Sequence, residues 1–237
     1  MIRTGDAFGE ALLSHLERED RGWHVIERDD GYVEPAAADV YFGDLRSWSP
    51  TEHQAMEAIT GSVLDVGAGA GRASLHLQDR GVDVTALDVS PGAIEVCRRR
   101  GIRQTFLGTV DEAAGGFDTF LFFGCNLGLI GSPEAAPRFF DAIGALSRPG
   151  ARIIGTMLDP YQTTDPDHLA IHEENRRNGR MAGQVTIRIR RGLLATGWFD
   201  LLWLSTGELR DLAATVGWKV TESWEHGPLH TSVLERA

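Results

Sequence analysis

Residues 63–71, Val-Leu-Asp-Val-Gly-Ala-Gly-Ala-Gly, decide the fold class of this chain. A short apolar run that ends in closely spaced glycines is typical of a β-strand that turns sharply into a helix. Glycine lets the backbone approach a ligand closely, and the N-terminus of the helix offers free N–H groups to an anion. Asp88, 23 residues after Asp65, closes the next expected strand, where a carboxylate can accept both hydroxyls of a ribose. The combination predicts a nucleotide-like ligand here, and not glycines that only shape a turn.

Strands and helices alternate around this turn between residues 61 and 158. The pattern predicts strands at 62–66, 82–87, 104–107, 117–123 and 151–158, and helices that begin near residues 72, 90 and 132. Such alternation favours right-handed βαβ units, and therefore an α/β fold whose parallel sheet is covered on both faces. A capping box at 205–208 predicts one more helix to about residue 216, and residues 219–234 predict a final antiparallel hairpin.

Two segments do not follow this rhythm. Residues 1–60 are expected to form an N-terminal helical lead-in or cap, with a first helix around Phe8 to Leu16, a possible hairpin at 23–33 and a helix starting at Ser49. Residues 159–204 are too many for a connecting loop, so they predict a lid, with strands at 185–190 and 198–204. The main domain is expected to span residues 61–237.

The composition excludes several classes of protein. The chain has 237 residues and a formal net charge of −11, with 34 acidic against 23 basic side chains, which argues against nucleic acid as its main partner. Two cysteines, Cys97 and Cys125, cannot build a disulfide framework and suit a cytoplasmic protein. No apolar run approaches the ~18 residues of a membrane span, and no signal peptide opens the chain. We expect a monomer or homodimer without a membrane partner.

The spacing of the glycines separates two kinds of cofactor. Dinucleotide-binding proteins carry G-x-G-x-x-G, whereas Gly67, Gly69 and Gly71 give G-x-G-x-G after an acid, Asp65. With this pattern the sequence, from about Tyr41 to the C-terminus, resembles the class I S-adenosylmethionine-dependent methyltransferases. The resemblance implies a Rossmann-like three-layer sandwich, with a seven-stranded, mostly parallel sheet, an antiparallel terminal hairpin and a lid after the fifth strand. It also implies S-adenosyl-L-methionine as cofactor and S-adenosyl-L-homocysteine as product.

The same resemblance implies which residues contact the cofactor. Asp65 starts the first motif, the glycines contact the methionine moiety, an acid holds the ribose, and residues after the third strand flank the adenine. Those positions are here Asp65, Gly67, Ala68, Gly69, Gly71, Asp88, Val89, Thr109, Val110 and Gly124. The adenine segment, residues 108–111, departs from the Gly-Asp pair that is commoner in the family.

A short-chain dehydrogenase is excluded by a second pattern. That class needs a Tyr-x-x-x-Lys pair. The residues four positions after Tyr32, Tyr41 and Tyr161 are Ala36, Leu45 and Asp165, so none supplies the lysine.

Catalytic candidates lie after the fourth and fifth strands. Asn126 can donate and accept a hydrogen bond near the transferred methyl, or it can cap a loop. The neighbouring Cys125 is expected to be a small buried residue and not a nucleophile. Tyr161, His168 and His172 follow the fifth strand, and the two histidines share one face if the segment is helical. They can be a general base, a metal pair or part of a solvated surface, and we expect no metal.

The segment after the fifth strand also bears on the acceptor. Arg188 and Arg190 share one face of an expected strand, which implies an anionic substrate if that face looks into the pocket and a solvated surface if it does not. Aromatic residues that could wall the pocket against an apolar or ring-bearing acceptor are Trp198, Phe199, Trp203, Tyr41, Phe42 and Trp48.

The resulting hypothesis is methyl transfer from S-adenosylmethionine to an O, N or C nucleophile of a small molecule. Direct displacement needs alignment and desolvation of the acceptor more than a dedicated base. Two alternatives stay open at this point: a non-catalytic module that binds the cofactor as a sensor or partner, and a methyltransferase of protein or RNA.

Overall fold

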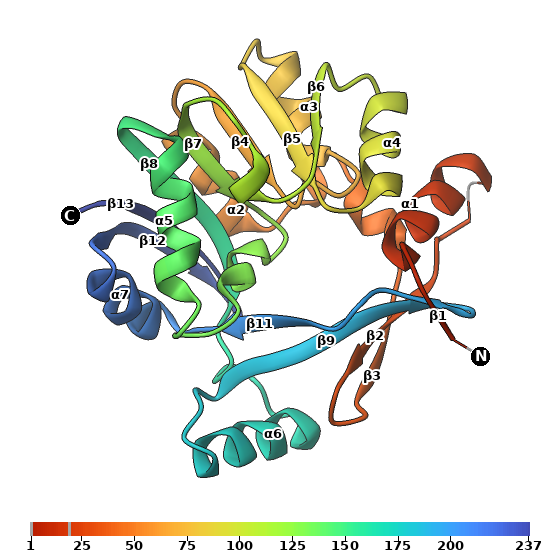
Figure 1. Cartoon of the computed structure of the whole chain (residues 1–237), viewed down its shortest axis with the longest axis vertical. Helices are drawn as coiled ribbons and strands as arrows, with labels where there is room; N and C mark the ends of the chain where they lie inside the picture. The colour runs from red at the N-terminus through yellow and green to blue at the C-terminus, as the bar shows by residue number, and fades with distance from the viewer. Residues whose placement is uncertain (1, 19) are drawn as a thin grey trace.

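A seven-stranded sheet forms the centre of the computed structural model, which describes residues 2–18 and 20–237 (Figure 1). Its strands, in spatial order, are β12 (Trp218–His226), β13 (Leu229–Arg236), β8 (Ser147–Leu158), β7 (Phe117–Phe122), β4 (Val63–Val66), β5 (Val84–Asp88) and β6 (Gln104–Leu107). Only β13 runs against its neighbours, so the expected mostly parallel sheet with a reversed terminal hairpin is confirmed.

Helices cover both faces of this sheet. They are α2 (Pro50–Ala55), α3 (Arg72–Asp79), α4 (Pro91–Arg99), α5 (Ala136–Leu146) and α7 (Thr206–Thr215). Strand β7 shows why both faces must be covered: Phe120 and Phe122 pack on one side with α5 and α7, while Leu121 and Phe123 pack on the other with α2 and α3. Side chains buried alternately on two faces produce the continuous apolar run that the sequence shows. The three-layer α/β sandwich is therefore confirmed.

A second, six-stranded sheet is built from two distant parts of the chain. Its strands are β1 (Arg3–Thr4), β10 (Leu194–Ala195), β9 (Gly183–Arg191), β2 (His24–Arg28), β3 (Val33–Ala36) and β11 (Phe199–Trp203). Strand β2 pairs antiparallel with one side of β9, and β11 pairs with the other. Figure 1 shows β9 and β11 crossing beyond the ends of the main strands, with β2 and β3 beside them. We call this second sheet the lid sheet.

Residues 1–60 contain the expected hairpin, as β2 and β3, but these two strands and β1 join the lid sheet, which the predicted helical lead-in or cap did not include. Their helices are α1 (Ala7–Arg18), α2, and the short 3₁₀ turns η1 (Ala38–Phe42), η2 (Leu45–Ser47) and η3 (Met56–Ala58). Further short or lid helices are η4 (Val110–Glu112), η5 (Asn126–Ile130) and α6 (Pro166–Arg177). No helix in residues 2–18 and 20–237 is long and apolar enough to cross a membrane.

The N-terminal segment is fastened to the main domain through Asp6. Its carboxylate accepts hydrogen bonds from the backbone N–H groups of Gly9 and Gly92, both at 2.8 Å, and from the Ser90 hydroxyl at 2.8 Å. One side chain thus caps the first turns of α1 and α4 together. This contact places α1 beside the glycine-rich turn, where the Phe8 ring lies 3.7 Å from the position that a Cβ on Gly69 would take.

Candidate functional site

A cavity of about 1160 Å³ lies between the carboxyl ends of the main strands and the lid sheet. We call it the main cavity. Its lining includes the glycine turn after β4, the end of β5, the loop after β7 and the apolar face of β9. In an open α/β sheet this edge is where ligands bind. The volume exceeds the 300–1,000 Å³ range that is usual for one small-molecule ligand, so the cavity has room for a cofactor and an acceptor together.

Positive backbone dihedrals explain the glycines of the turn. The φ angles of Gly67, Gly69 and Gly71 are 70°, 57° and 74°, in the region that residues with a Cβ rarely adopt. Gly67 and Gly69 line the main cavity together with Ala68. Gly71 does not line it. A Cβ there would meet Ile102 and Cys97, so this glycine allows the start of α3 to pack against α4 and the segment after it, and does not contact a ligand in the main cavity.

Asp88 fits the role of a ribose-binding acid. It is 6% exposed and lines the main cavity, and its two oxygens accept the backbone N–H groups of Gly69 and Ser90, each at 2.9 Å. Burial raises the pKa of the Asp88 carboxyl, against these hydrogen bonds, which lower it. Each carboxylate oxygen can accept more than one hydrogen bond, so both can still bind a diol. The adjacent Val89 is exposed and lines the cavity as well.

Asp65 lies deeper, behind the turn. Its carboxylate accepts the Ser74 hydroxyl of α3 at 2.7 Å and is 3% exposed, although it also borders the main cavity. Burial raises the pKa of the Asp65 carboxyl to about 6, against the Ser74 hydrogen bond, which lowers it. The residue therefore connects strand β4 to helix α3 and fixes the turn between them.

The shifted pKa of Asp65 predicts a pH-dependent stability. The folded protein keeps this proton up to about pH 6, whereas the unfolded chain releases it near 3.8, so the stabilisation is complete below 3.8 and is lost as pH rises through about 6. Asp65→Asn removes that loss, so its melting temperature relative to wild type, measured by circular dichroism, is expected to rise between about pH 4.5 and about pH 6.5 and to stay level above that. Hydrogen bonds from Ser62 and Arg148 lower the pKa of Asp118, so Asp118→Asn should show a constant offset over this range. A constant offset for Asp65→Asn would contradict the prediction.

Asn126 joins the loop after β7 to the glycine turn. Its Nδ2 donates to the backbone oxygen of Gly67 at 2.8 Å and of Val66 at 3.3 Å, and the side chain lines the main cavity. Both N–H groups of the amide are thereby used, which leaves Oδ1 to accept a bond from a ligand. Gly124 also lines the cavity, with φ 66°. The structure thus places Asn126 and Gly124 at the edge of the sheet where the sequence expected them to lie.

Gly67→Ala tests how tightly this junction is built. A Cβ on Gly67 would lie 2.5 Å from Nδ2 of Asn126, in addition to the strain of a positive φ. We expect a loss of about 2–4 kcal/mol in unfolding free energy, because a strained φ alone costs about 1–3 kcal/mol. Gly81→Ala is the matched control, since Gly81 has φ 80° with nothing within 4 Å of its Cβ position. Urea titration measures both variants, and equal losses would show that the Asn126 contact is unimportant.

Cys125 is unsuited to nucleophilic chemistry. It is the one non-glycine residue with positive φ in the part of the chain that the structure describes, at 67°. Burial raises the pKa of its thiol to about 12, and the thiolate is the reactive form. It lines the main cavity as a protonated, apolar group.

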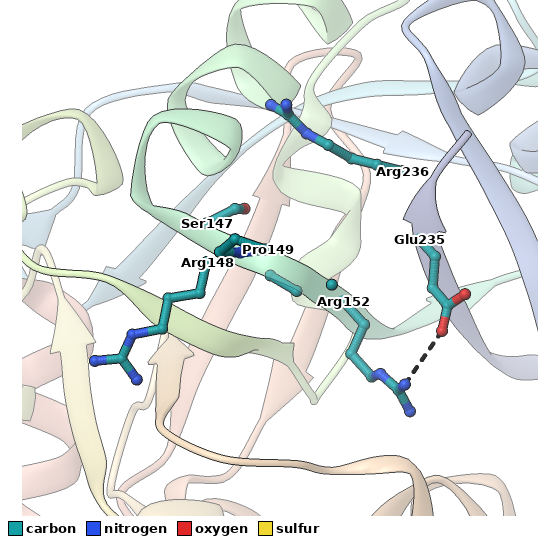
Figure 2. A pocket seen from close by; sticks show the side chains of 8 residues that line it. Ser147, Arg148, Pro149, Arg152, Glu235 and Arg236 are labelled. Atoms are coloured by element: carbon teal, nitrogen blue, oxygen red, sulfur yellow. Dashed lines mark ion pairs between the residues drawn. The ribbon is translucent and has the colours of Figure 1, made fainter.

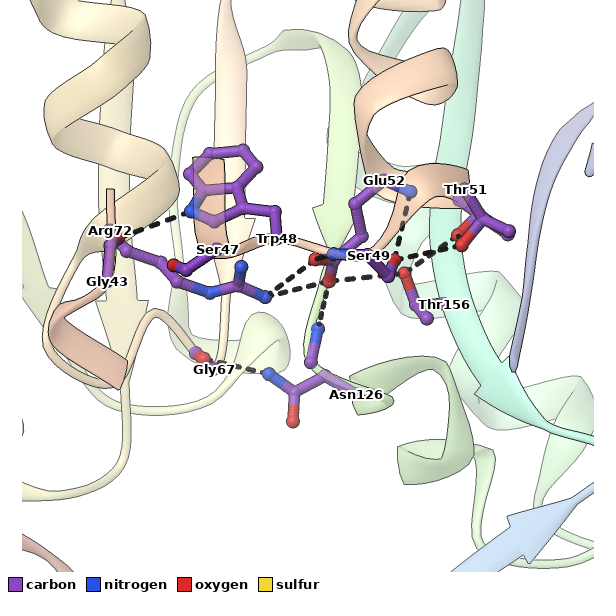
Figure 3. A network of polar contacts seen from close by, with 12 residues as sticks. Gly43, Ser47, Trp48, Ser49, Thr51, Glu52, Gly67, Arg72, Asn126 and Thr156 are labelled. Carbon is purple, nitrogen blue, oxygen red and sulfur yellow. Dashed lines mark hydrogen bonds and ion pairs between the residues drawn. The ribbon is translucent and has the colours of Figure 1, made fainter. Parts of the chain in front are cut away.

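A buried ion pair supports the same edge of the sheet (Figure 3). Oε1 of Glu52, from α2, accepts from Nη2 of Arg72 at 2.7 Å and from the backbone N–H of Gly124 at 2.9 Å. The Arg72 guanidinium also stacks on Trp48 at 4.8 Å from the ring centroid and borders the main cavity. The sequence predicted the capping box that starts α2 but not this second use of Glu52. The position of Arg72 directly after the last glycine was the available signal.

The histidine candidates lie together at the other end of the cavity. His168 and His172 sit on one face of α6 and both line the main cavity. His172 is 6% exposed, and burial, followed by the charge of Arg176, lowers its pKa so that it is neutral near pH 7. The ring of Tyr32, from the N-terminal segment, lies 5.1 Å from that of His168. The described residues hold no group of three His, Cys, Asp or Glu side chains that could bind a metal ion.

Besides Gly71, three predicted site residues lie away from the main cavity. Tyr161 is 45% exposed, and its hydroxyl donates to Glu208 at 2.5 Å. Thr109 begins η4, where its N–H and hydroxyl both donate to Glu112, at 2.9 and 3.0 Å. Val110 packs against the main core instead. The backbone after β6 turns these two side chains away from the cavity.

The arginine face of β9 also points away from the cavity. Val185, Ile187 and Ile189 line the cavity, so the intervening Arg188 and Arg190 lie on the opposite face. There both pair with Glu27, at 2.9 and 3.4 Å. These arginines therefore cannot recognise an anionic acceptor. Of the aromatic residues expected to wall the pocket, four line it (Tyr41, Trp198, Phe199 and Trp203) and two do not (Phe42 and Trp48).

A smaller cleft of about 540 Å³ lies at the opposite end of the main sheet, where β8 starts. Figure 2 shows that its arginines do not converge: Arg148 and Arg152 point to one side of the strand in different directions, and Arg236 points to the other. Asp118 pairs with Arg148 at 2.9 Å and Glu235 with Arg152 at 3.2 Å. The main cavity is therefore the candidate active site.

Comparison with known proteins supports this assignment. Residues 63–150 match the family model described as a methyltransferase domain. A demethylmenaquinone methyltransferase of Renibacterium salmoninarum is 44% identical over 59 residues, which are 24% of this chain and 25% of that relative. The match thus spans about a quarter of the length of that relative.

Solved structures extend the similarity to the whole chain. A SAM-dependent methyltransferase from Bacteroides fragilis, crystallised with S-adenosyl-L-homocysteine, is 26% identical with a TM-score of 0.84, over 100% of this chain and 98% of its own. The 1,6-didemethyltoxoflavin-N1-methyltransferase of Burkholderia thailandensis is 20% identical with a TM-score of 0.51, over 78% of this chain and 74% of its own, and shows a shared fold. The first neighbour covers the N-terminal segment and the lid as well as the central domain.

Proposed function

The chain belongs to the class I S-adenosylmethionine-dependent methyltransferases, and we propose that it methylates an O, N or C nucleophile of a small molecule held in the main cavity. The observation that carries this proposal is the lid sheet, which forms a wall opposite the glycine turn, with the main cavity between them. Pairing of β2 with β9 joins the N-terminal segment and the later lid strands into one continuous wall, and a cavity between two walls suits a small molecule better than a large surface of protein or RNA.

The residues around the turn fit S-adenosylmethionine. Asp88 would accept the ribose hydroxyls, Gly67 to Gly69 would cradle the methionine part, and Asp65 holds the turn from behind. When bound, the cofactor supplies an activated methyl group. The chain then has to align the acceptor, exclude water and, for an acidic O–H or N–H, receive a proton.

His172 and His168 are the proton acceptors that we propose for such a substrate. A neutral imidazole can take a proton near pH 7, and the lowered pKa of His172 keeps it neutral there. Asn126 would orient the acceptor through its free Oδ1. Tyr161 would not contact the acceptor, because its hydroxyl donates to Glu208. Its ring lies 6.5 Å from that of His172, so its role would be to help position this histidine.

The test is turnover with methyl-labelled S-adenosylmethionine and a fractionated small-molecule extract. Transfer of label into a low-mass fraction, with formation of S-adenosylhomocysteine, is the expected result. Label that enters only protein or RNA added in parallel would favour a macromolecular substrate. Cofactor binding without any labelled product would favour a sensor or partner module. The acceptor atom, a cytoplasmic location and a monomeric or homodimeric state stay predictions.

A further inference from the structure

The inner wall of the main cavity opposite the cofactor turn is flat and apolar. It is the face of the lid sheet that carries Val185, Ile187, Ile189, Ile26 and Leu201. A β-sheet presents alternate side chains to one face, so these five branched aliphatic groups form an uncharged patch, which Arg28, opposite Ile187 on β2, borders at one edge. The charged side chains of β9 are on the other face. A flat apolar body can lie against such a wall without desolvating a charge.

Aromatic side chains bound this wall. Trp198, Phe199 and Trp203 follow β9 along the chain, and Tyr32 directly precedes β3. Trp198 is 46% exposed, and its ring is fixed from outside by the Arg188 guanidinium, 4.5 Å from its centroid. Aromatic rings at these positions can pair edge-to-face or offset with a planar ligand, an interaction that a saturated ligand does not offer.

At the polar end of the cavity, the arginine among the described lining residues is already paired. Arg28 is the cation in that half of the lining, and Asp30 holds it with two hydrogen bonds of 2.8 and 2.7 Å. The same guanidinium donates to the backbone oxygen of Asp167 at 3.1 Å. Two further acids, Glu34 and Asp159, line the cavity nearby. An anion placed here would meet carboxylates and a cation that is already neutralised.

From this combination we propose that the acceptor is an uncharged aromatic or heteroaromatic ring compound that lies flat against the lid-sheet wall, with a hydroxyl or N–H group as its polar function. The inference rests on the proposed function, since it describes the acceptor half of the same cavity. It replaces the anionic acceptor that the arginine pattern of β9 suggested.

Binding of matched probes tests both parts of the proposal. The probes are 2-naphthol, which is uncharged at pH 7, its anionic analogue 2-naphthoate, and its saturated counterpart decahydro-2-naphthol. Calorimetry with the whole chain, with and without S-adenosylhomocysteine, is expected to give the tightest binding for 2-naphthol. Relative to 2-naphthol, we expect 2-naphthoate to bind at least ~10-fold more weakly, because desolvation of its carboxylate is not compensated. We expect the saturated compound to bind ~2- to 10-fold more weakly. Equal or tighter binding of either analogue overturns the proposal.

Trp198→Ala tests whether 2-naphthol binds in the main cavity. It should weaken 2-naphthol binding ~2- to 10-fold and leave S-adenosylhomocysteine binding unchanged. Trp23→Ala is the matched control, because Trp23 is also exposed, at 54%, and also lies under an arginine, Arg21, at 4.8 Å, but does not line the cavity. Equal effects of the two variants on 2-naphthol overturn the proposal. Failure of S-adenosylhomocysteine to bind would instead refute the proposed function. The relative affinities of the three probes, measured without cofactor, would still test this inference.

Discussion

Asp88→Ala is expected to weaken S-adenosylhomocysteine binding by about 10- to 100-fold. The carboxylate is the acid at the carboxyl end of β5 inside the main cavity, and hydrogen bonds to a charged group contribute about 1.5–3 kcal/mol. The effect has a second source, because the backbone N–H groups of Gly69 and Ser90 lose their acceptor and the turn loosens. Calorimetric titration of S-adenosylhomocysteine measures the change.

Two further variants separate these sources. Asp88→Asn keeps one oxygen that can accept an N–H bond but lacks the charge, so its affinity should fall between wild type and the alanine variant. Asp83→Ala removes an exposed acid from the opposite end of the same strand, where its carboxylate only accepts from Gln104. Its affinity for S-adenosylhomocysteine should equal that of wild type. Unchanged affinity in Asp88→Ala would refute the ribose-binding role.

The sequence predicted the cofactor half of the molecule because that half is encoded locally. Gly67, Gly69 and Asp88 lie in or directly after strands that pair with each other, and a positive φ leaves glycine almost no substitute. Gly71 shows the limit of the same reasoning. It has the same dihedral and spacing, but Ile102 and Cys97 pack where its side chain would be, and no local pattern reports that contact.

The acceptor half depends on contacts that are distant in the sequence. The wall of the cavity exists because Val25 to Arg28 of β2 pair with residues 187–190 of β9, about 160 positions later. The alternation in β9 shows that arginines and aliphatic residues take opposite faces but not which face is inside. Glu27 on β2 settles this by pairing with Arg188. Because this separation in sequence is so long, the sequence did not suggest Arg28 and Tyr32 as cavity residues either.

Glu52→Ala is expected to lower the unfolding free energy by about 3–5 kcal/mol, because it leaves a largely buried cation without its partner. The carboxylate is 4% exposed and the Arg72 side chain 16%. At about 2–4 °C per kcal/mol for a chain of this size, the melting temperature should fall by ~6–20 °C. The backbone N–H of Gly124 loses its acceptor as well, and the capping box with Ser49 is broken. Thermal unfolding by circular dichroism measures the change.

A double-mutant cycle tests whether the lost stability comes from leaving Arg72 unpaired or from the strength of the Glu52–Arg72 ion pair itself. A buried pair gains little over apolar side chains, since desolvation opposes the attraction, whereas a single survivor is costly. Glu52→Ala combined with Arg72→Ala should therefore lose clearly less stability than the sum of the single variants. Glu57→Ala, five residues further on and exposed, should change stability by less than about 0.5 kcal/mol. Strictly additive losses in the double variant would mean that Glu52 stabilises the sheet edge through its backbone hydrogen bonds alone.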